Sequence, residues 1–210
     1  MEKTEKEKII EALKKCYQDK GKRNFLQSVE LVINFKDVDF SKEGSRVNIT
    51  LVLPKGRGKE KKILVFAEDP IASEAKKLGV NLVLKGNEIS KLSKDKIKKM
   101  IKDWEFLVEP KLMATFGKEF GQVLGSRGKL PSPIIGKLDQ LIKNSKDHVT
   151  IRSRGKYLPT LSCPVGTEEM KIEDVAENIE TVIDSIKSKV TGKISSIYVK
   201  LSMGKPNKIE

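Results

Sequence analysis

The chain has few of the residues on which most catalytic and metal sites depend. Its 210 residues include one histidine, His148, and two cysteines, Cys16 and Cys163, which stand far apart and form no Cys-x-x-Cys pair. We therefore expect neither a zinc site nor a histidine-based catalytic triad. Two distant thiols also give no disulfide framework, which fits a reducing compartment.

Long apolar runs and aromatic residues are scarce as well. No run approaches the roughly 18 apolar residues of a membrane span, and the opening MEKTEKEKII lacks the apolar stretch of a signal peptide. Aromatic residues make up 5% of the chain, so a core must come mainly from Ile, Leu and Val. These absences predict a soluble, cytoplasmic protein with no membrane partner.

Positive charge is present in excess. The chain has 42 Lys and Arg residues against 29 Asp and Glu residues, a net charge of +13. Such an excess attracts polyanions, of which nucleic acid is the commonest large one in the cytoplasm. A solvated surface rich in both charges would explain the 34% of charged residues, but it would not explain the imbalance.

The two signs of charge separate in the last sixty residues. Acidic residues crowd residues 168–184, which read as a helix and its lead-in. Repulsion would turn that helix away from a nucleic acid, so we expect the strands and their loops to carry the binding face. The basic residues before and after it include Arg152, Arg154, Lys200 and Lys205.

Hydrophobic periodicity divides the chain into two styles. Amphipathic helices and alternating strands are predicted near both ends, whereas the middle alternates buried apolar runs such as KILVFA with helical stretches. The middle pattern is typical of a parallel, Rossmann-like sheet. We therefore predict an α+β split domain, an antiparallel sheet with two helices, from residues 1–60 and 150–210. An inserted α/β Rossmann-like domain is predicted over residues 61–149.

Several local expectations follow from the same patterns. Phe25 shares the odd parity of Val29 and Leu31, so it is either a core strand residue or a ligand contact. Residues 148–167 look like a hairpin, and residues 110–126 like a helical stretch broken by glycines. Asp69 is expected to cap the helix that follows it.

The glycine-rich stretch FGQVLGSRGKLPSP, residues 120–133, raises the question of a nucleotide site. A P-loop needs G-x-x-x-x-G-K-[ST], but Val stands at position 123 and Leu at position 130, so the match fails twice. The segment GSRG also resembles the GXXG loop with which KH domains clamp a nucleic-acid backbone. The alternative interpretation is the end of a helix followed by a turn. We expect no cofactor, and an NTP-binding enzyme using Gly125–Lys129 is kept as a competing hypothesis.

Separated motifs in the chain resemble one protein family. These are NFLQSVELVINF, GQVLGSRGKLPSP and KLSMGKP, and the last helix, EDVAENIETVIDSI, is similar as well. They look like the universal ribosomal protein of the large-subunit lateral stalk, the first-numbered protein of that subunit. The lysine in RGKLPSP looks archaeal or eukaryotic rather than bacterial, and the absence of a long eukaryotic-type extension suggests an archaeal member. The resemblance spans nearly the whole chain, with the motifs in the family's order.

This resemblance implies a non-catalytic RNA-binding protein that is a monomer when free. Its expected partners are large-subunit rRNA, its own mRNA, whose translation it would repress, and exit-site tRNA, which the stalk helps to release. Its location would be the large ribosomal subunit in the cytoplasm. A non-ribosomal RNA-processing factor of similar fold is the other alternative.

The resemblance also implies the RNA-contacting residues. By motif match they are Phe25, Ser28 and Glu30 of the first strand and Ser202, Met203 and Gly204 after the last. Lys205, Arg152 and Arg154 are expected to attract phosphates nearby. A second contact, with RNA or with the other domain, is assigned to Gly125, Arg127, Gly128 and Lys129. No catalytic or metal-binding residue is expected.

Overall fold

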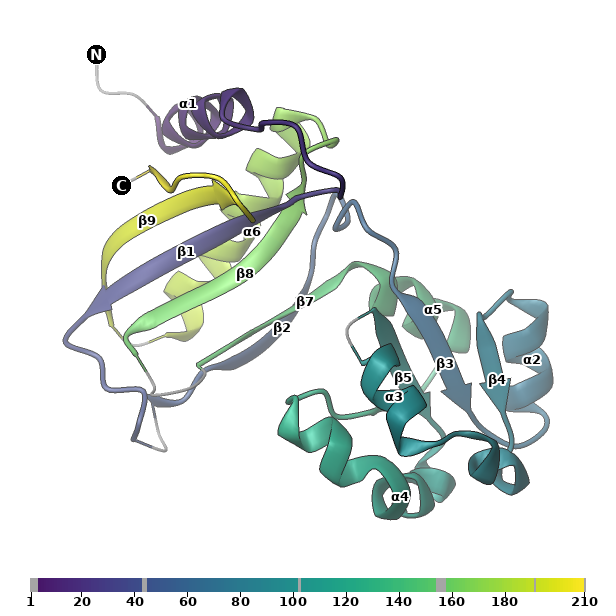
Figure 1. Ribbon diagram of the computed structural model, residues 1–210. Coiled ribbons are helices and arrows are strands. Elements are labelled where there is room, and N and C mark those ends of the chain that lie inside the picture. Colours follow the sequence, from purple (N-terminus) through teal and green to yellow (C-terminus); the bar gives the residue numbers. More distant parts are fainter. Residues whose placement is uncertain (1–3, 43–44, 102, 154–157, 191, 210) are drawn as a thin grey trace. The chain divides into compact units, whose positions relative to one another are not determined.

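The chain forms two compact units in a computed structural model that describes residues 4–42, 45–101, 103–153, 158–190 and 192–209 (Figure 1). Unit 1 consists of residues 1–59 and 148–210, and unit 2 of residues 60–147. Both units combine helices with sheets, so the prediction of a mixed α/β chain is confirmed. None of the helices in the described ranges has the length and apolar character needed to span a bilayer.

Unit 1 is built on a four-stranded sheet in the order β10-β9-β1-β8, in which neighbouring strands are antiparallel. A separate antiparallel pair joins β2 to β7. The elements of unit 1 are α1 (Glu5–Gln18), β1 (Ser28–Lys36), β2 (Asn48–Val52), β7 (His148–Arg152), β8 (Thr160–Thr167), α6 (Ile172–Lys189), β9 (Lys193–Leu201) and β10 (Asn207–Lys208).

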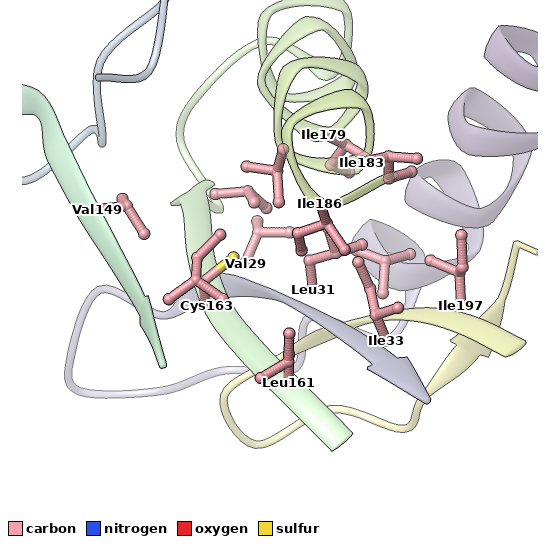
Figure 2. Close-up of a cluster of buried hydrophobic side chains, with 14 of the residues drawn as sticks. Val29, Leu31, Ile33, Val149, Leu161, Cys163, Ile179, Ile183, Ile186 and Ile197 are labelled. Carbon is pink, nitrogen blue, oxygen red and sulfur yellow. The ribbon is translucent and has the colours of Figure 1, made fainter. Parts of the chain in front are cut away.

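The core of unit 1 lies between one face of this sheet and its two helices. Strand alternation points Val29, Leu31 and Ile33 inward, where they meet the apolar stripe of α6 (Figure 2). Helix α1 begins with a capping box, in which Thr4 and Glu7 bind each other's backbone N–H, and it buries Leu13 in the same core. Neither of the two described helices of unit 1 lies on the opposite face of the sheet (Figure 1).

Unit 2 is built on a parallel sheet in the order β4-β3-β5-β6. Its strands are β3 (Lys62–Phe66), β4 (Leu82–Leu84), β5 (Trp104–Val108) and β6 (Ser132–Pro133). Its helices are α2 (Ile71–Lys77), α3 (Lys94–Met100), α4 (Met113–Ser126) and α5 (Leu138–Asp147), together with the 3-10 turns η2 (Gly86–Lys91) and η3 (Pro110–Leu112).

Both faces of the unit 2 sheet are buried. Leu64 and Phe66 of β3 pack in a cluster with α3 and α4, whereas Ile63 and Val65 pack in another with α2 and α5. A strand covered on both sides has no polar position to alternate with, which explains the continuous apolar run ILVF at residues 63–66. The expectation of a strand buried on both faces is confirmed here.

Two sequence-based expectations about strands and helices are wrong. Strand β7 pairs with β2, with Ile151 opposite Ile49, so residues 148–167 do not form a hairpin. Instead β8 pairs with β1, far away in the sequence. Helix α4 continues through its glycines, because burying its stripe of Phe116, Phe120 and Leu124 outweighs a cost of about 1 kcal/mol per exposed glycine.

Other elements differ from the sequence analysis or were missing from it. Helix α2 begins at Ile71 rather than at Pro70, and the Asp69 carboxylate accepts a bond of 2.6 Å from the Ser73 hydroxyl instead of capping a backbone N–H. The short strands β6 and β10 and helix α5 were not predicted. Two-residue strands give weak periodic signals. Helix α5 did have a signal that was overlooked, because Leu138, Leu141 and Ile142 have the spacing of an amphipathic helix.

Candidate nucleic-acid interface

The start of β1 and the end of β9 are neighbours in the sheet and place two predicted serines together. The Ser202 backbone N–H donates to the Ser28 carbonyl at 3.0 Å, and the Ser28 N–H donates to the Ser202 hydroxyl at 3.3 Å. The same hydroxyl lies 3.2 Å from a carboxylate oxygen of Glu30. We call Gln27, Ser28, Glu30, Lys200 and Ser202 the strand-end cluster.

Glu30 and Lys200 hold each other at the surface of this cluster. The Lys200 ammonium lies 3.8 Å from the Glu30 carboxylate and donates to the Ser202 carbonyl at 2.9 Å. The Lys200 side chain is 24% exposed and the Glu30 side chain is 39% exposed, so a ligand at the surface can contact both. A fixed carboxylate can accept from a ribose 2′-OH or a base amino group, and a fixed ammonium can donate to a phosphate.

The turn after β9 presents a large apolar side chain to solvent. The Met203 N–H donates to the Gln27 side chain at 3.2 Å, and the Gly204 N–H donates to the Leu201 carbonyl at 2.9 Å. The backbone is thus fixed while the Met203 side chain is 62% exposed. A Cβ atom at Gly204 would lie 3.1 Å from the Leu201 Cβ atom, so glycine serves the packing of this turn.

Phe25 lies in the segment that leads into β1 and is 52% exposed. The interpretation of Phe25 as a core strand residue is therefore wrong: the strand begins at Ser28, and parity does not apply before it. The side chain is available for a ligand, as the motif match implies. An exposed phenylalanine and an exposed methionine thus flank the strand-end cluster in sequence.

Gln27 is a central residue that the sequence analysis missed. Its side chain is 1% exposed and donates to the Lys20 carbonyl at 2.9 Å and to the Glu168 carboxylate at 3.1 Å. Its own N–H donates to Glu168 at 3.0 Å. The acidic segment from residue 168 was predicted to face away from the binding site. For Glu168 this is wrong, because its side chain is only 7% exposed and lies beneath the cluster, bound to Gln27.

The predicted basic residues are not all brought to the cluster. Lys205 is exposed directly after the turn. Arg152 ends β7 and pairs with Asn48 in the two-stranded sheet of unit 1, not in the sheet that carries the strand-end cluster. Arg154 lies outside the described residues.

The glycine-rich stretch is the end of a helix. Helix α4 continues to Ser126, Gly128 adopts a positive φ of 63°, and the Lys129 N–H donates to the Leu124 carbonyl at 3.0 Å. The Lys129 ammonium donates to the Trp104 carbonyl at 3.0 Å and lies 3.4 Å from Glu105. That ammonium is engaged by the sheet, which argues against a phosphate cradle. Arg127 is exposed.

The reactive groups of unit 1 are protected by burial. Burial raises the pKa of the Cys163 thiol to about 12, and it raises the pKa of Cys16 as well. Burial, with the charges of Cys16 and Glu168, raises the pKa of Tyr17 to about 12. Neither thiol is a nucleophile at neutral pH. Among the residues that the structure describes, no three His, Cys, Asp or Glu side chains are placed to hold a metal ion.

Comparisons with known proteins identify the class first: the chain is similar to ribosomal proteins. Large ribosomal subunit protein uL1 of Methanocella arvoryzae is 40% identical over 212 residues, covering 97% of this chain and 99% of the relative. The protein of that name from Thermoplasma acidophilum is 42% identical over 204 residues, 93% of each chain. That from Thermococcus kodakarensis is 37% identical over 215 residues, 98% of each.

The family follows from a match to its sequence profile. The profile of the Ribosomal protein L1p/L10e family matches residues 13–205, so the chain belongs to that family. The predicted family is confirmed, and the three relatives named are archaeal, as the lysine in RGKLPSP suggested. Membership in a family of ribosomal proteins also confirms that the chain is not an enzyme.

Proposed function

We propose that this protein binds ribosomal RNA in the large ribosomal subunit, in the cytoplasm, through the strand-end cluster and its two flanking apolar side chains. The observation that carries the proposal is the combination of fixed polar groups with exposed Phe25 and Met203 on either side of them in the sequence. The archaeal relatives named as large ribosomal subunit proteins support the RNA as partner.

Each group of the cluster has a role suited to RNA. Serine hydroxyls and the Glu30 carboxylate suit the 2′-hydroxyls of a wide, shallow minor groove, which distinguish RNA from DNA. Phe25 and Met203 would pack on a sugar or on the face of an unstacked base. Lys200 and Lys205 would attract phosphates, and this part of the affinity should fall as salt rises.

The finer assignments extend the same proposal. Unit 1 would be the split RNA-binding domain, and unit 2 a Rossmann-like domain inserted into it, since its parallel sheet is covered by helices on both faces. The protein would be a monomer when free. In the ribosome it would assist release of exit-site tRNA through the stalk, and off the ribosome it would bind its own mRNA and repress translation.

A gel-shift titration against a large-subunit stalk rRNA fragment, with bulk tRNA as competitor, tests the main proposal. We expect competitor-resistant binding that Met203→Ala weakens about tenfold, since burial of a methionine side chain against the RNA contributes about 1.5–3 kcal/mol. Leu158→Ala is the matched control, because Leu158 is an equally exposed apolar residue of unit 1, at 63%. Equal loss in both variants, or binding that tRNA abolishes, would refute the site.

The repressor role needs a separate experiment. The leader of the protein's own mRNA should compete with the rRNA fragment, because both would occupy the strand-end cluster. Met203→Ala should weaken both complexes by a similar factor. Simultaneous binding of the two RNAs would show that the mRNA does not use this site.

A further inference from the structure

A buried polar pair lies beneath the strand-end cluster. Gln27 is 1% exposed, and the Glu168 side chain is 7% exposed. Three hydrogen bonds join the two residues. The Gln27 N–H and its side-chain amide donate to the Glu168 carboxylate at 3.0 and 3.1 Å, and the Glu168 N–H donates to the Gln27 carbonyl at 3.1 Å. A satisfied polar pair stabilises a core little more than apolar side chains of the same shape would, so this pair points to a role other than stability.

The contacts of the Gln27 amide allow only one orientation. Its Nε2 atom faces the Lys20 carbonyl and the Glu168 carboxylate, which accept hydrogen bonds and do not donate them. Its Oε1 atom lies 3.2 Å from the Met203 backbone N–H, which donates and does not accept. Turning the amide over would set acceptor against acceptors and donor against donor. The Glu168 carboxylate therefore determines which side of the amide faces the turn after β9.

The Met203 backbone is fixed through this amide. Its N–H donates to the Gln27 side chain, whereas the N–H groups of its two neighbours, Ser202 and Gly204, donate to backbone carbonyls. The side-chain anchor thus holds the one residue of the turn whose large apolar side chain is exposed. The position of the Met203 side chain depends on Gln27, and the orientation of Gln27 depends on Glu168.

We propose that Gln27 and Glu168 are positioning residues for RNA binding, which act through the Met203 turn and do not contact RNA themselves. The inference rests on the proposed function, in which Met203 contacts RNA. Both side chains are too buried to reach a ligand at the surface, so their effect passes through the Met203 backbone. A turn that is already held in place loses less conformational entropy when RNA binds.

Exchanging the two side-chain groups tests this role at constant net charge, with the full chain. Gln27→Glu alone sets a second carboxylate against Glu168 and the Lys20 carbonyl, so the Met203 N–H should lose its fixed acceptor. The double variant Gln27→Glu/Glu168→Gln again pairs an amide with a carboxylate, and it has the net charge of the unaltered chain. The free oxygen of the carboxylate at position 27 can then accept from the Met203 N–H.

The first readout is the affinity for the stalk rRNA fragment. We expect Gln27→Glu to weaken binding about tenfold, the factor expected for Met203→Ala, because it acts by releasing Met203. The exchanged double variant should recover to within about threefold of the unaltered chain. In a Met203→Ala background, Gln27→Glu should cost no more than about twofold, since the contact on which it acts is already removed.

The second readout needs no RNA. Hydrogen exchange of the Met203 N–H, followed by NMR, should be faster in Gln27→Glu and slow again in the exchanged variant. Asn178→Ala is the matched control, because Asn178 is another buried amide of unit 1, with three hydrogen bonds to residues outside the strand-end cluster. It should lower the stability of unit 1 and leave RNA affinity unchanged at a temperature where unit 1 stays folded.

The outcomes separate this role from the proposed function. An equal loss of affinity in Asn178→Ala, no recovery in the exchanged variant, or a full loss from Gln27→Glu in the Met203→Ala background would overturn the positioning role. If Met203→Ala weakens binding and Gln27→Glu does not, the positioning role is wrong and the proposed function stands. If Met203→Ala leaves binding unchanged, the proposed site is wrong, and the positioning role is overturned with it.

Discussion

The two units bury their sheets in different ways, and the difference separates a binding surface from a support. The unit 1 sheet is antiparallel and covered by helices on one face, so its strands alternate and its strand ends remain polar. The unit 2 sheet is parallel and covered on both faces, so its central strands β3 and β5 are mostly apolar and buried. A sheet with one open face can offer polar groups to a ligand, whereas unit 2 offers only its helices and loops.

The composition lets each unit be followed separately. The single tryptophan, Trp104, lies in unit 2, whereas both cysteines and all three tyrosines lie in unit 1. Tryptophan fluorescence therefore reports the unfolding of unit 2. Labelling of the buried Cys16 and Cys163 thiols reports the unfolding of unit 1.

The largest effect is expected from Phe116→Ala in unit 2. Phe116 is fully buried, with ring centroids 5.4 Å from Phe66 and 5.2 Å from Phe120. The cavity should cost unit 2 about 3–5 kcal/mol of unfolding free energy, seen in Trp104 fluorescence during denaturation, with thiol labelling unchanged. Phe25→Ala, which removes the same ring from an exposed position, should cost little. Simultaneous loss of both signals would mean that the units do not unfold separately.

Asn178→Ala should destabilise unit 1 instead. The buried Asn178 amide donates to the Gly56 and Val165 carbonyls, both at 2.9 Å, and accepts from the Lys55 N–H at 3.0 Å. Its removal leaves three backbone groups without this partner, at a cost of about 2–4 kcal/mol. Thiol labelling should become faster while Trp104 fluorescence is unaffected. Thr181→Ala on the same helix is the control with a small expected effect.

Unit 1 should lose stability at high pH through Tyr17. Its hydroxyl donates to the Thr167 carbonyl at 3.0 Å, and burial first of all raises its pKa from 10.0 to about 12. The folded state favours the protonated phenol, so this contribution is complete below pH 10 and disappears as the pH rises toward 12. Because the Tyr17 side chain is partly exposed, we expect the unfolding free energy of unit 1 to fall by about 1–2 kcal/mol between pH 9 and pH 12, measured by denaturation at the two pH values. Tyr17→Phe should remove the part of this dependence that comes from Tyr17 and leave the part from the Cys163 thiol, whose pKa burial also raises to about 12.

The smallest effect is expected from Gly121→Ala, which should increase the stability of unit 2. A Cβ atom there would meet nothing within 4 Å, so the variant should stabilise α4 by up to about 1 kcal/mol. The same change at Gly58 in unit 1 should destabilise, because its φ is +71° and the Cβ atom would lie 2.4 Å from the Thr167 hydroxyl. Melting curves of the two variants should shift in opposite directions.

The sequence predicted well where local pattern and burial agree. The stripe of α6 and the alternation of β1 each specify one buried face, and both elements form as expected. The pairing of β7 with β2 could not be read locally, because any alternating strand can pair with any other. Phe25 was misplaced because alternation does not indicate where a strand begins.

The candidate site was predictable by its motifs but not by its geometry. Ser28, Glu30 and Ser202 were named from sequence, and the structure places both Ser28 and Glu30 within hydrogen-bond distance of Ser202. Gln27 and Glu168 beneath them were missed, because a buried polar pair leaves no periodic signal. Arg152 was expected nearby only because it is basic, and its strand belongs to the other sheet.

The two ends of unit 2 lie close together: the ammonium of Lys146, two residues before the chain returns to unit 1 at His148, is 4.0 Å from the carboxylate of Glu60, the first residue of unit 2. A segment whose first and last residues lie close together needs only two neighbouring attachment points in the chain that contains it. Such a segment can be gained, exchanged or lost in evolution in a single genetic event, without altering the core of the chain that receives it. The ancestry of unit 1 and that of unit 2 are, on this ground, separate questions.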